Sequence, residues 1–283
     1  MSQPDTLWTP SREHMLTTNA WAFLHWLEAT RGIVLDGWAG LHGYSAADPV
    51  GLRAALAAFA NLPEAPSRLL RHAGEREALV LHGADASRRA LSRDELAADP
   101  AGLPTDIAAA IARLWPRPSL ARALADLLLH QDVRPDDRVL VAANPTWPSL
   151  AALLEGATVI IYAGRPDRLL AAVAEEQASI LVAPSAWLAD LSFQRSVRRP
   201  DLRALRSIVI TGGPLAPEAR IRVATWIKPN LMLLARAGET IWGNPLEPVR
   251  VRPSPSPALF APVRAGSVRA GSVRPPGAAP DPP

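Results

Sequence analysis

A pair of adjacent glycines after an apolar run is the feature of this sequence that most suggests a ligand site. The run at residues 207–211 predicts a strand, and a helix is expected to begin near Pro217. Adjacent glycines let backbone amides approach a ligand closely, and the following helix presents its positive end. The pattern indicates a ligand-binding turn, although such a turn can also serve only to reverse the chain. The candidate residues are Thr211, Gly212, Gly213, Pro214 and Leu215.

A second candidate follows the next apolar run, at residues 231–235, and comprises Gly238, Glu239 and Thr240. A carboxylate and a hydroxyl beside a glycine can hold a magnesium–phosphate group, because both offer oxygen ligands. The same residues can equally cap a helix. The sequence leaves both interpretations open.

The remaining reactive side chains form no catalytic set. The six histidines are scattered without the spacing of metal ligands. The chain has no cysteine, which excludes disulfides, thiolate zinc sites and cysteine nucleophiles. There is no Gly-x-Ser-x-Gly elbow, no phosphate loop of the Walker type and no Gly-x-Gly-x-x-Gly after a strand. We therefore assign no catalytic residue.

Five short apolar runs must position these candidates. Each run is continuous rather than alternating, which is typical of strands covered on both faces. Segments with helical spacing lie between them, and the alternation of strand and crossover helix indicates a parallel sheet. We therefore predict an α/β fold, a mainly parallel sheet with helices on both faces, whose ligands gather beyond the carboxyl ends of the strands. The runs are residues 138–143, 158–162, 179–183, 207–211 and 231–235.

The sequence before this part predicts a helical N-terminal cap at residues 1–70. A first helix is expected at residues 12–30 and a second at about 49–60, because apolar residues recur there with helical spacing. Between the two helices we expect an extended turn that contains Trp38 and Tyr44.

The α/β domain is assigned to residues 71–250. It begins with a predicted hairpin at residues 77–91, which leads into a helix from Ser92. Residues 251–283 are dominated by proline, alanine, serine, glycine and arginine. Such a composition cannot bury enough apolar surface to order itself, so we expect a disordered tail.

Charge and hydropathy narrow the classes of partner. The 30 basic residues include a single lysine, Lys228, and against 27 acidic residues they leave a net charge of +3. No cluster of basic and aromatic residues is evident in the part expected to fold, so we do not expect nucleic-acid binding. No apolar run approaches the roughly 20 residues of a membrane span, and no signal sequence is visible. We therefore expect no membrane span and a cytoplasmic location.

Three groups of residues occur in the order and spacing of a known enzyme family. Their clearest members are Trp8, Asn19, Phe23, Trp26, Arg31 and Gly32; Leu128, His130, Asp132, Pro135, Gly156 and Gly164; and Thr211, Gly212, Gly213, Pro214, Gly243, Asn244 and Pro245. Taken together they resemble the AMP-forming acyl-CoA ligases, most closely the acetoacetyl-CoA synthetase branch. The resemblance covers most of residues 7–250.

This resemblance implies a set of ligands. Residues 211–215 match the turn that binds the adenosine part of the adenylate in that family. Residues 238–240 match the stretch that supplies a threonine to the phosphate and an acid to magnesium. The family's Gly-Thr-Asp order reads Gly238-Glu239-Thr240 here, so hydroxyl and carboxylate are exchanged. The implied cofactors are ATP or AMP, CoA and Mg²⁺, with Glu239 as the implied metal ligand.

Two departures from the family bear on activity. The family's phosphate loop, rich in serine, threonine and glycine and ending in Pro-Lys, should fall at residues 99–118, which lack such a run and contain no lysine. After Val249 the family continues into a C-terminal domain with a catalytic lysine, whereas this chain has only the tail. Adenylation needs cations and amides that hold the triphosphate and stabilise charge in the transition state. We therefore expect an internally deleted, C-terminally truncated and inactive form.

Two other functions stay open. One is an active ligase for ATP, a short-chain acid and CoA, in which other residues replace the missing groups. The other is a nonenzymatic nucleotide-binding or protein-interaction module. The expected partners are an adenine nucleotide and either a second copy of the chain or a full-length relative, because the missing part of the domain would leave apolar surface exposed.

Overall fold

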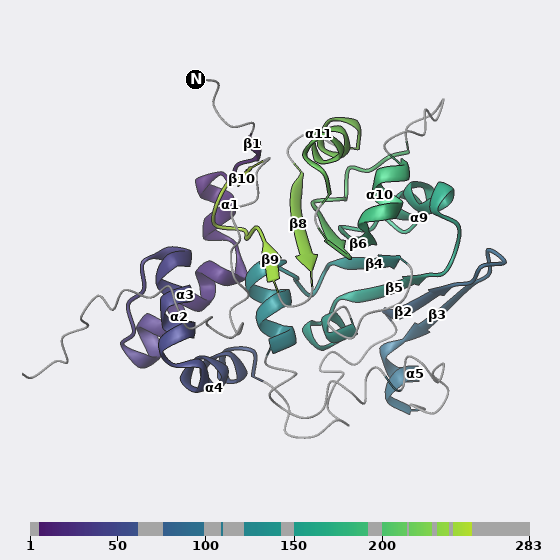
Figure 1. Cartoon of the computed structure of the whole chain (residues 1–283). Coiled ribbons are helices and arrows are strands. Elements are labelled where there is room, and N and C mark those ends of the chain that lie inside the picture. The colour runs from purple at the N-terminus through teal and green to yellow at the C-terminus, as the bar shows by residue number, and fades with distance from the viewer. Residues whose placement is uncertain are drawn as a thin grey trace, which may run out of the picture.

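A computed structural model describes residues 6–61, 76–98, 109, 122–142, 150–191, 200–213, 215–227, 231–237 and 240–250. In these residues eight strands form one sheet, with the order β3-β2-β5-β4-β6-β7-β8-β9 (Figure 1). The strands are β2 (Glu77–His82), β3 (Arg88–Ser92), β4 (Arg138–Ala142), β5 (Thr158–Tyr162), β6 (Ile180–Pro184), β7 (Ser207–Thr211), β8 (Met232–Ala237) and β9 (Thr240–Trp242).

The sheet is mainly parallel, as the sequence predicts. The six inner strands run in one direction, and the edge strands β3 and β9 are antiparallel to their neighbours. Every residue of β5 is buried, which explains why its apolar run is continuous rather than alternating. The predicted runs coincide with β4 to β8 within one or two residues.

Helices cover both faces of this sheet (Figure 1). One face carries α9 (Leu169–Glu175), α10 (Ser185–Leu191) and α11 (Pro217–Trp226). The other carries the helix that ends in the π-helical turn Ala125–His130 and the 3-10 turn Ala151–Glu155. The predicted α/β fold class is therefore confirmed.

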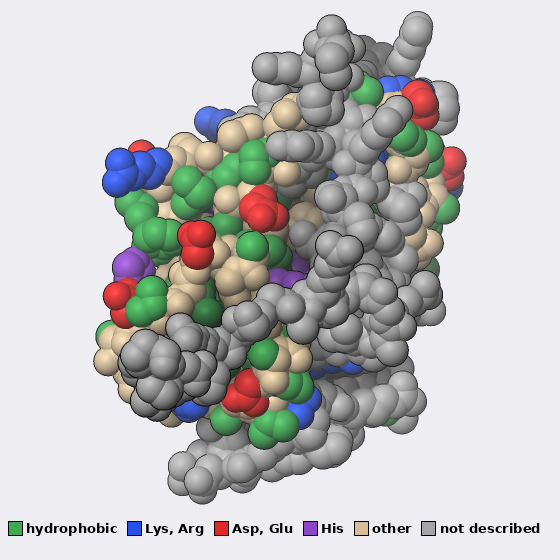
Figure 2. Space-filling model, turned by 60° about the vertical axis from the view of Figure 1, so that its left-hand side comes forward, with side chains coloured by type: hydrophobic (Ala, Val, Ile, Leu, Met, Phe, Trp, Pro, Cys, Tyr) green, Lys and Arg blue, Asp and Glu red, His purple; other side chains and the backbone are tan. Residues whose placement is uncertain are grey.

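The N-terminal segment is helical and packs beside the sheet (Figure 1). Its helices are α1 (Arg12–Leu16), α2 (Asn19–Arg31), α3 (Gly37–Ala47) and α4 (Pro49–Phe59). Figure 2 views this side and shows hydrophobic side chains interspersed with acidic and other polar ones.

Two details of this segment differ from the prediction. The single helix expected at residues 12–30 is two helices, because the Thr18 hydroxyl accepts a hydrogen bond from the Trp21 amide and starts a new one. The extended turn expected around Trp38 and Tyr44 was wrong, since both lie in α3. Burial of Trp38 and Leu41 in the core outweighs the poor helix propensity of the glycines in this helix.

Hydrogen bonds fix the helical segment to the α/β part. The Asn19 amide donates to the Asp132 carboxylate at 2.8 Å, and the Asn19 side chain donates to the carbonyl of Val133 at 2.8 Å. In addition β1 (Thr6–Trp8) pairs antiparallel with β10 (Val249–Arg250), which joins the two ends of the described chain.

The hairpin β2–β3 extends the sheet beyond β5. Its strand β2 pairs in parallel with β5, and its second strand, β3, is followed by α5 (Arg93–Ala98). The fully buried Arg93 guanidinium donates to the carbonyls of Leu153, Gly156 and Ala157, which precede β5. These hydrogen bonds fix the hairpin to the segment that leads into β5.

Two segments discussed from the sequence lie outside the described residues. They are residues 99–118, apart from residue 109, and the expected tail at 251–283. Within the part of the chain that the structure describes, no helix is long and apolar enough to cross a membrane.

Candidate functional site

The glycine turn lies at the carboxyl end of β7. Thr211 is the last residue of the strand, and Gly212 and Gly213 follow with φ of 78° and 123°. These angles are strained for residues with a side chain, so the turn requires glycine. Leu215 is buried, and Pro214 lies outside the described residues.

One side of this turn is open. A Cβ atom built on Gly213 would meet no described atom within 4 Å, and one on Gly212 would meet only the Ser185 hydroxyl at 3.9 Å. Crowding by the described residues therefore does not explain the glycines. Their hydrogen side chains leave space in which another molecule can approach the backbone.

The turn also lies close to the point where the strand order reverses. From β4 the chain passes to β5 on one side and then returns past β4 to β6 on the other. Ligands of open α/β sheets bind at such a reversal, beyond the carboxyl ends of the strands. Thr211 pairs in register with Pro184 at the end of β6, which places the turn one strand away.

The second candidate is the connection from β8 to β9. Ala237 and Thr240 are partners in register, so these strands form a tight hairpin. Thr240 begins a strand, and the interpretation of residues 238–240 as a helix cap was therefore wrong. Gly238 and Glu239 lie outside the described residues, and the magnesium assignment to Glu239 stays a prediction. Among described side chains, no group of three His, Asp or Glu could hold a metal ion.

A buried ion pair involves the strand to which the glycine turn is hydrogen-bonded. Arg236 of β8 pairs with Asp126, and the side chains are only 18% and 5% exposed. The Gly213 amide donates to the carbonyl oxygen of the same Arg236, with 3.3 Å between nitrogen and oxygen. This pair was not predicted from the sequence. Its signal was an aspartate inside the otherwise apolar run at residues 123–129.

His130 lies beside this pair in a fully buried position. Burial lowers the pKa of His130 to about 3, although a hydrogen bond with the carbonyl of Gly243 opposes the shift. The ring also packs edge-on against Trp38, with centroids 4.6 Å apart. His130 is therefore a neutral core histidine that joins the N-terminal helices to the site.

Comparison with solved structures reveals the same fold in an acyl-CoA synthetase. The acetoacetyl-CoA synthetase of Streptomyces lividans superposes with a TM-score of 0.71 at 14% identity, covering 87% of this chain and 67% of that one. The resemblance expected from the sequence is thus confirmed at the level of the fold.

Two further structures match only in part. The amide bond synthetase McbA of Marinactinospora thermotolerans matches with a TM-score of 0.35 and 24% identity, covering 42% of this chain and 24% of that one. The N-terminal domain of FACL13 from Mycobacterium tuberculosis matches with a TM-score of 0.35 and 21% identity, covering 40% of this chain and 31% of that one. No protein-family model and no curated protein sequence matches the chain.

Proposed function

We propose that this chain is an acetoacetyl-CoA synthetase-like protein that binds the adenosine part of an adenine nucleotide at residues 211–215. The observation that carries the proposal is the open glycine turn, found at the carboxyl end of a parallel strand in a sheet with the acyl-CoA synthetase fold. A flat base can lie against the backbone where glycines carry no side chain.

The phosphate end of the nucleotide is assigned to the neighbouring hairpin. Thr240 begins β9 directly after the connection from β8, and β8 lies beside β7 in the sheet. A nucleotide held at Gly212 and Gly213 would point its phosphates toward residues 238–240. Glu239 is proposed as the Mg²⁺ ligand there, as the family resemblance implies.

We infer that the chain does not complete the activation of an acid. Residues 99–118 stand in place of the family's phosphate loop and contain no lysine, and the single lysine of the sequence is Lys228. Removal of one such transition-state donor typically lowers the rate by roughly a hundred- to a thousandfold. ATP, AMP and CoA are therefore proposed as bound ligands rather than as reactants.

Thermal-shift titration with AMP, ATP and CoA tests binding. Ligand binding to the native state raises the melting temperature with dose, and saturation at 100 times Kd contributes about 2.7 kcal/mol. We expect a shift with AMP that Gly213→Ala abolishes. Gly32→Ala is the matched control, because Gly32 also has positive φ (66°) and an open Cβ position but caps the distant helix α2. No shift at millimolar AMP would overturn the proposal.

ATP–pyrophosphate exchange with acetoacetate and other short acids tests the inferred lack of turnover. We expect no exchange above background. Exchange that depends on the added acid would instead establish an active ligase in which other residues replace the phosphate loop.

A further inference from the structure

A pocket lies beside the carboxyl ends of β2 and β5. Its volume is about 450 Å³, which suits a small organic ligand. His82 and Tyr162 are the last residues of these strands and are partners in register. The strands β4 and β6 separate this pocket from the glycine turn, so it is a distinct site.

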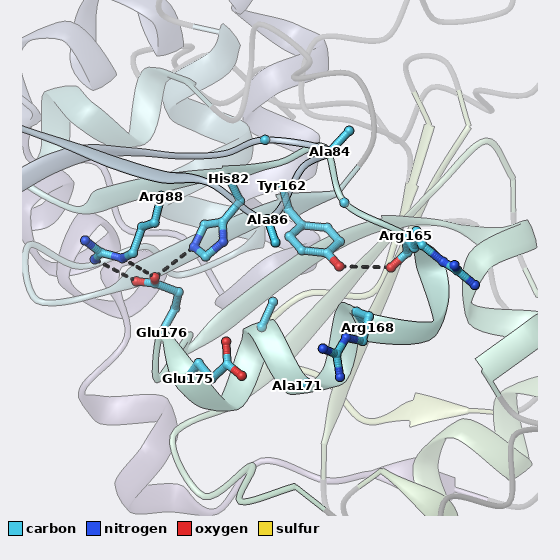
Figure 3. Close-up of a pocket in the computed structure, with 13 residues that line it drawn as sticks. His82, Ala84, Ala86, Arg88, Tyr162, Arg165, Arg168, Ala171, Glu175 and Glu176 are labelled. Atoms are coloured by element: carbon cyan, nitrogen blue, oxygen red, sulfur yellow. Dashed lines mark hydrogen bonds and ion pairs between the residues drawn. The ribbon is translucent and has the colours of Figure 1, made fainter.

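The floor of the pocket is a preorganised polar cluster. The Nε2 atom of His82 lies 2.8 Å from a carboxylate oxygen of Glu176, and Arg88 donates to the same oxygen at 2.7 Å (Figure 3). Arg138 pairs with the other oxygen of Glu176. Because these charges satisfy one another, they shape the pocket and leave the recognition of a charged ligand to other residues.

Small residues form the walls. The turn after β2 contributes Gly83, Ala84 and Ala86, and α9 contributes Ala171 and Ala172. Figure 3 shows the Tyr162 ring between the turn and the helix, with its hydroxyl bonded to the carbonyl oxygen of Arg165. Such a slot fits an apolar or aromatic group that packs against the tyrosine ring.

Two opposite charges at this slot have no ion-pair partner among the described residues. Arg168 and Glu175 line the pocket and are exposed. Arg168 directly precedes α9 and Glu175 is its last residue, so the two charges lie at opposite ends of this helix. By contrast, Arg165 pairs with Asp167, and Figure 3 shows its guanidinium turned away from Tyr162.

The field of both charges reaches the tyrosine. Burial raises the pKa of Tyr162, the negative charges of Asp167 and Glu175 raise it further, and Arg168 opposes them. Figure 3 shows Arg168 and Glu175 below the tyrosine ring, with Ala171 between them. The slot therefore has a cation at one end, an anion at the other and an apolar middle.

We propose that this pocket binds an ω-amino acid, a small zwitterion whose carboxylate and ammonium groups are separated by a short apolar or aromatic spacer. Arg168 receives the carboxylate, Glu175 receives the ammonium group, and the spacer lies against Tyr162. A ligand with a single charge would leave one of the two side chains without a partner and would lose that ion pair. This inference is independent of the nucleotide site.

Isothermal titration calorimetry with 4-(aminomethyl)benzoate tests the proposal. We expect saturable binding with Kd at or below about 1 mM. Two analogues separate the charges: 4-methylbenzoate lacks the ammonium group and benzylamine lacks the carboxylate. Each should bind about tenfold more weakly or worse, a change that corresponds to about 1.4 kcal/mol.

Variants assign the binding to this pocket. Arg168→Gln and Glu175→Gln should each weaken binding about tenfold, while melting temperatures stay close to that of the parent because both residues are exposed. The matched control is Arg165→Gln, which should leave Kd within about twofold. The proposal is overturned if no saturable binding occurs, if 4-methylbenzoate binds as tightly as the zwitterion, or if neither Arg168→Gln nor Glu175→Gln changes Kd.

Discussion

The amide of Gly213 donates a hydrogen bond to the carbonyl oxygen of Arg236, 3.3 Å away, at the carboxyl ends of two neighbouring parallel strands. One peptide group thereby ties the candidate nucleotide turn to the strand that leads to residues 238–240. Gly213 has a φ of 123° in this arrangement, a conformation that other residues rarely adopt.

The two glycines should differ in their tolerance of a side chain. Gly212 has φ of 78°, near the left-handed region, whereas Gly213 lies well outside it. We expect Gly212→Ala to cost about 1 kcal/mol of unfolding free energy and Gly213→Ala about 1–3 kcal/mol. Urea denaturation measures both. Equal costs, or a larger one for Gly212→Ala, would contradict the backbone strain described for the turn.

The ion pair between Arg236 and Asp126 should contribute more to the free energy of unfolding than exposed ion pairs do. Replacing Arg236 with glutamine removes one member of a buried ion pair, which typically costs about 3–5 kcal/mol. The matched control is Arg203→Gln, since the side chains of Arg203 and Asp201 are 91% and 58% exposed. Its cost should stay below about 1 kcal/mol. Chemical denaturation measures the loss of unfolding free energy in both variants. Similar losses would show that the buried pair does not stabilise the site.

His130 should make stability depend on pH on the acidic side of neutrality. Its pKa is about 3 in the folded protein and ordinarily 6.5, so below pH 6.5 the unfolded chain binds a proton that the folded chain cannot. Stability should then fall by roughly 1.4 kcal/mol per pH unit from this residue. His14, whose pKa burial also lowers, acts in the same direction.

Denaturation between pH 7 and pH 5 tests this dependence. His130→Gln should reduce the slope of stability against pH, and the part of the slope that His14 contributes should remain. The comparison variant is His25→Gln, which removes a histidine whose side chain is 58% exposed. A slope that His130→Gln does not alter would refute the buried neutral state.

Glu176 should stabilise the fold at neutral pH and lose this effect in acid. Burial alone would raise its pKa, but hydrogen bonds from Arg88 and His82 outweigh burial and lower the pKa from 4.5 to about 2. The stabilisation is complete above pH 4.5 and disappears as pH falls toward 2. The difference in melting temperature between the parent and Glu176→Gln should therefore narrow below pH 4.5. Glu218→Gln, on an exposed position of α11, serves as the reference.

Self-association is expected through the N-terminal helical segment. The large hydrophobic side chains that are most exposed in the described residues are Leu16, Val34 and Val50, at 49%, 75% and 66%. Sedimentation velocity should show species larger than a monomer, and replacing all three with serine should reduce them. A parent protein that sediments as a single monomer would rule this surface out as a contact.

The sequence revealed the strands and the glycine turn because both are encoded locally. The run Ser207–Thr211 and the two glycines after it specify a strand and its turn without reference to distant residues. The helix α3 could not be found in this way, since burial of Trp38 stabilises it rather than its own propensity. The pair Arg236–Asp126 could not be predicted either, because its members are 110 positions apart in the sequence.

The pocket beside Tyr162 was also beyond local reasoning. Each of His82 and Tyr162 ends an unremarkable strand, and only the parallel pairing of β2 with β5 brings them together. The hairpin was predicted, but its partner strand was not. Continuous apolar runs indicate that a strand is buried and do not specify which neighbour covers its edge.

The pairing of β2 with β5 sets an order for the folding of this chain. The Thr158 hydroxyl donates to the carbonyl of Glu77 from 81 positions away, so the entropy of a long loop opposes this junction. The contacts among β4, β5 and β6 close shorter loops and should form earlier along the pathway. We expect β2 to dock late, so that Arg93→Met accelerates unfolding and leaves the refolding rate nearly unchanged in stopped-flow kinetics.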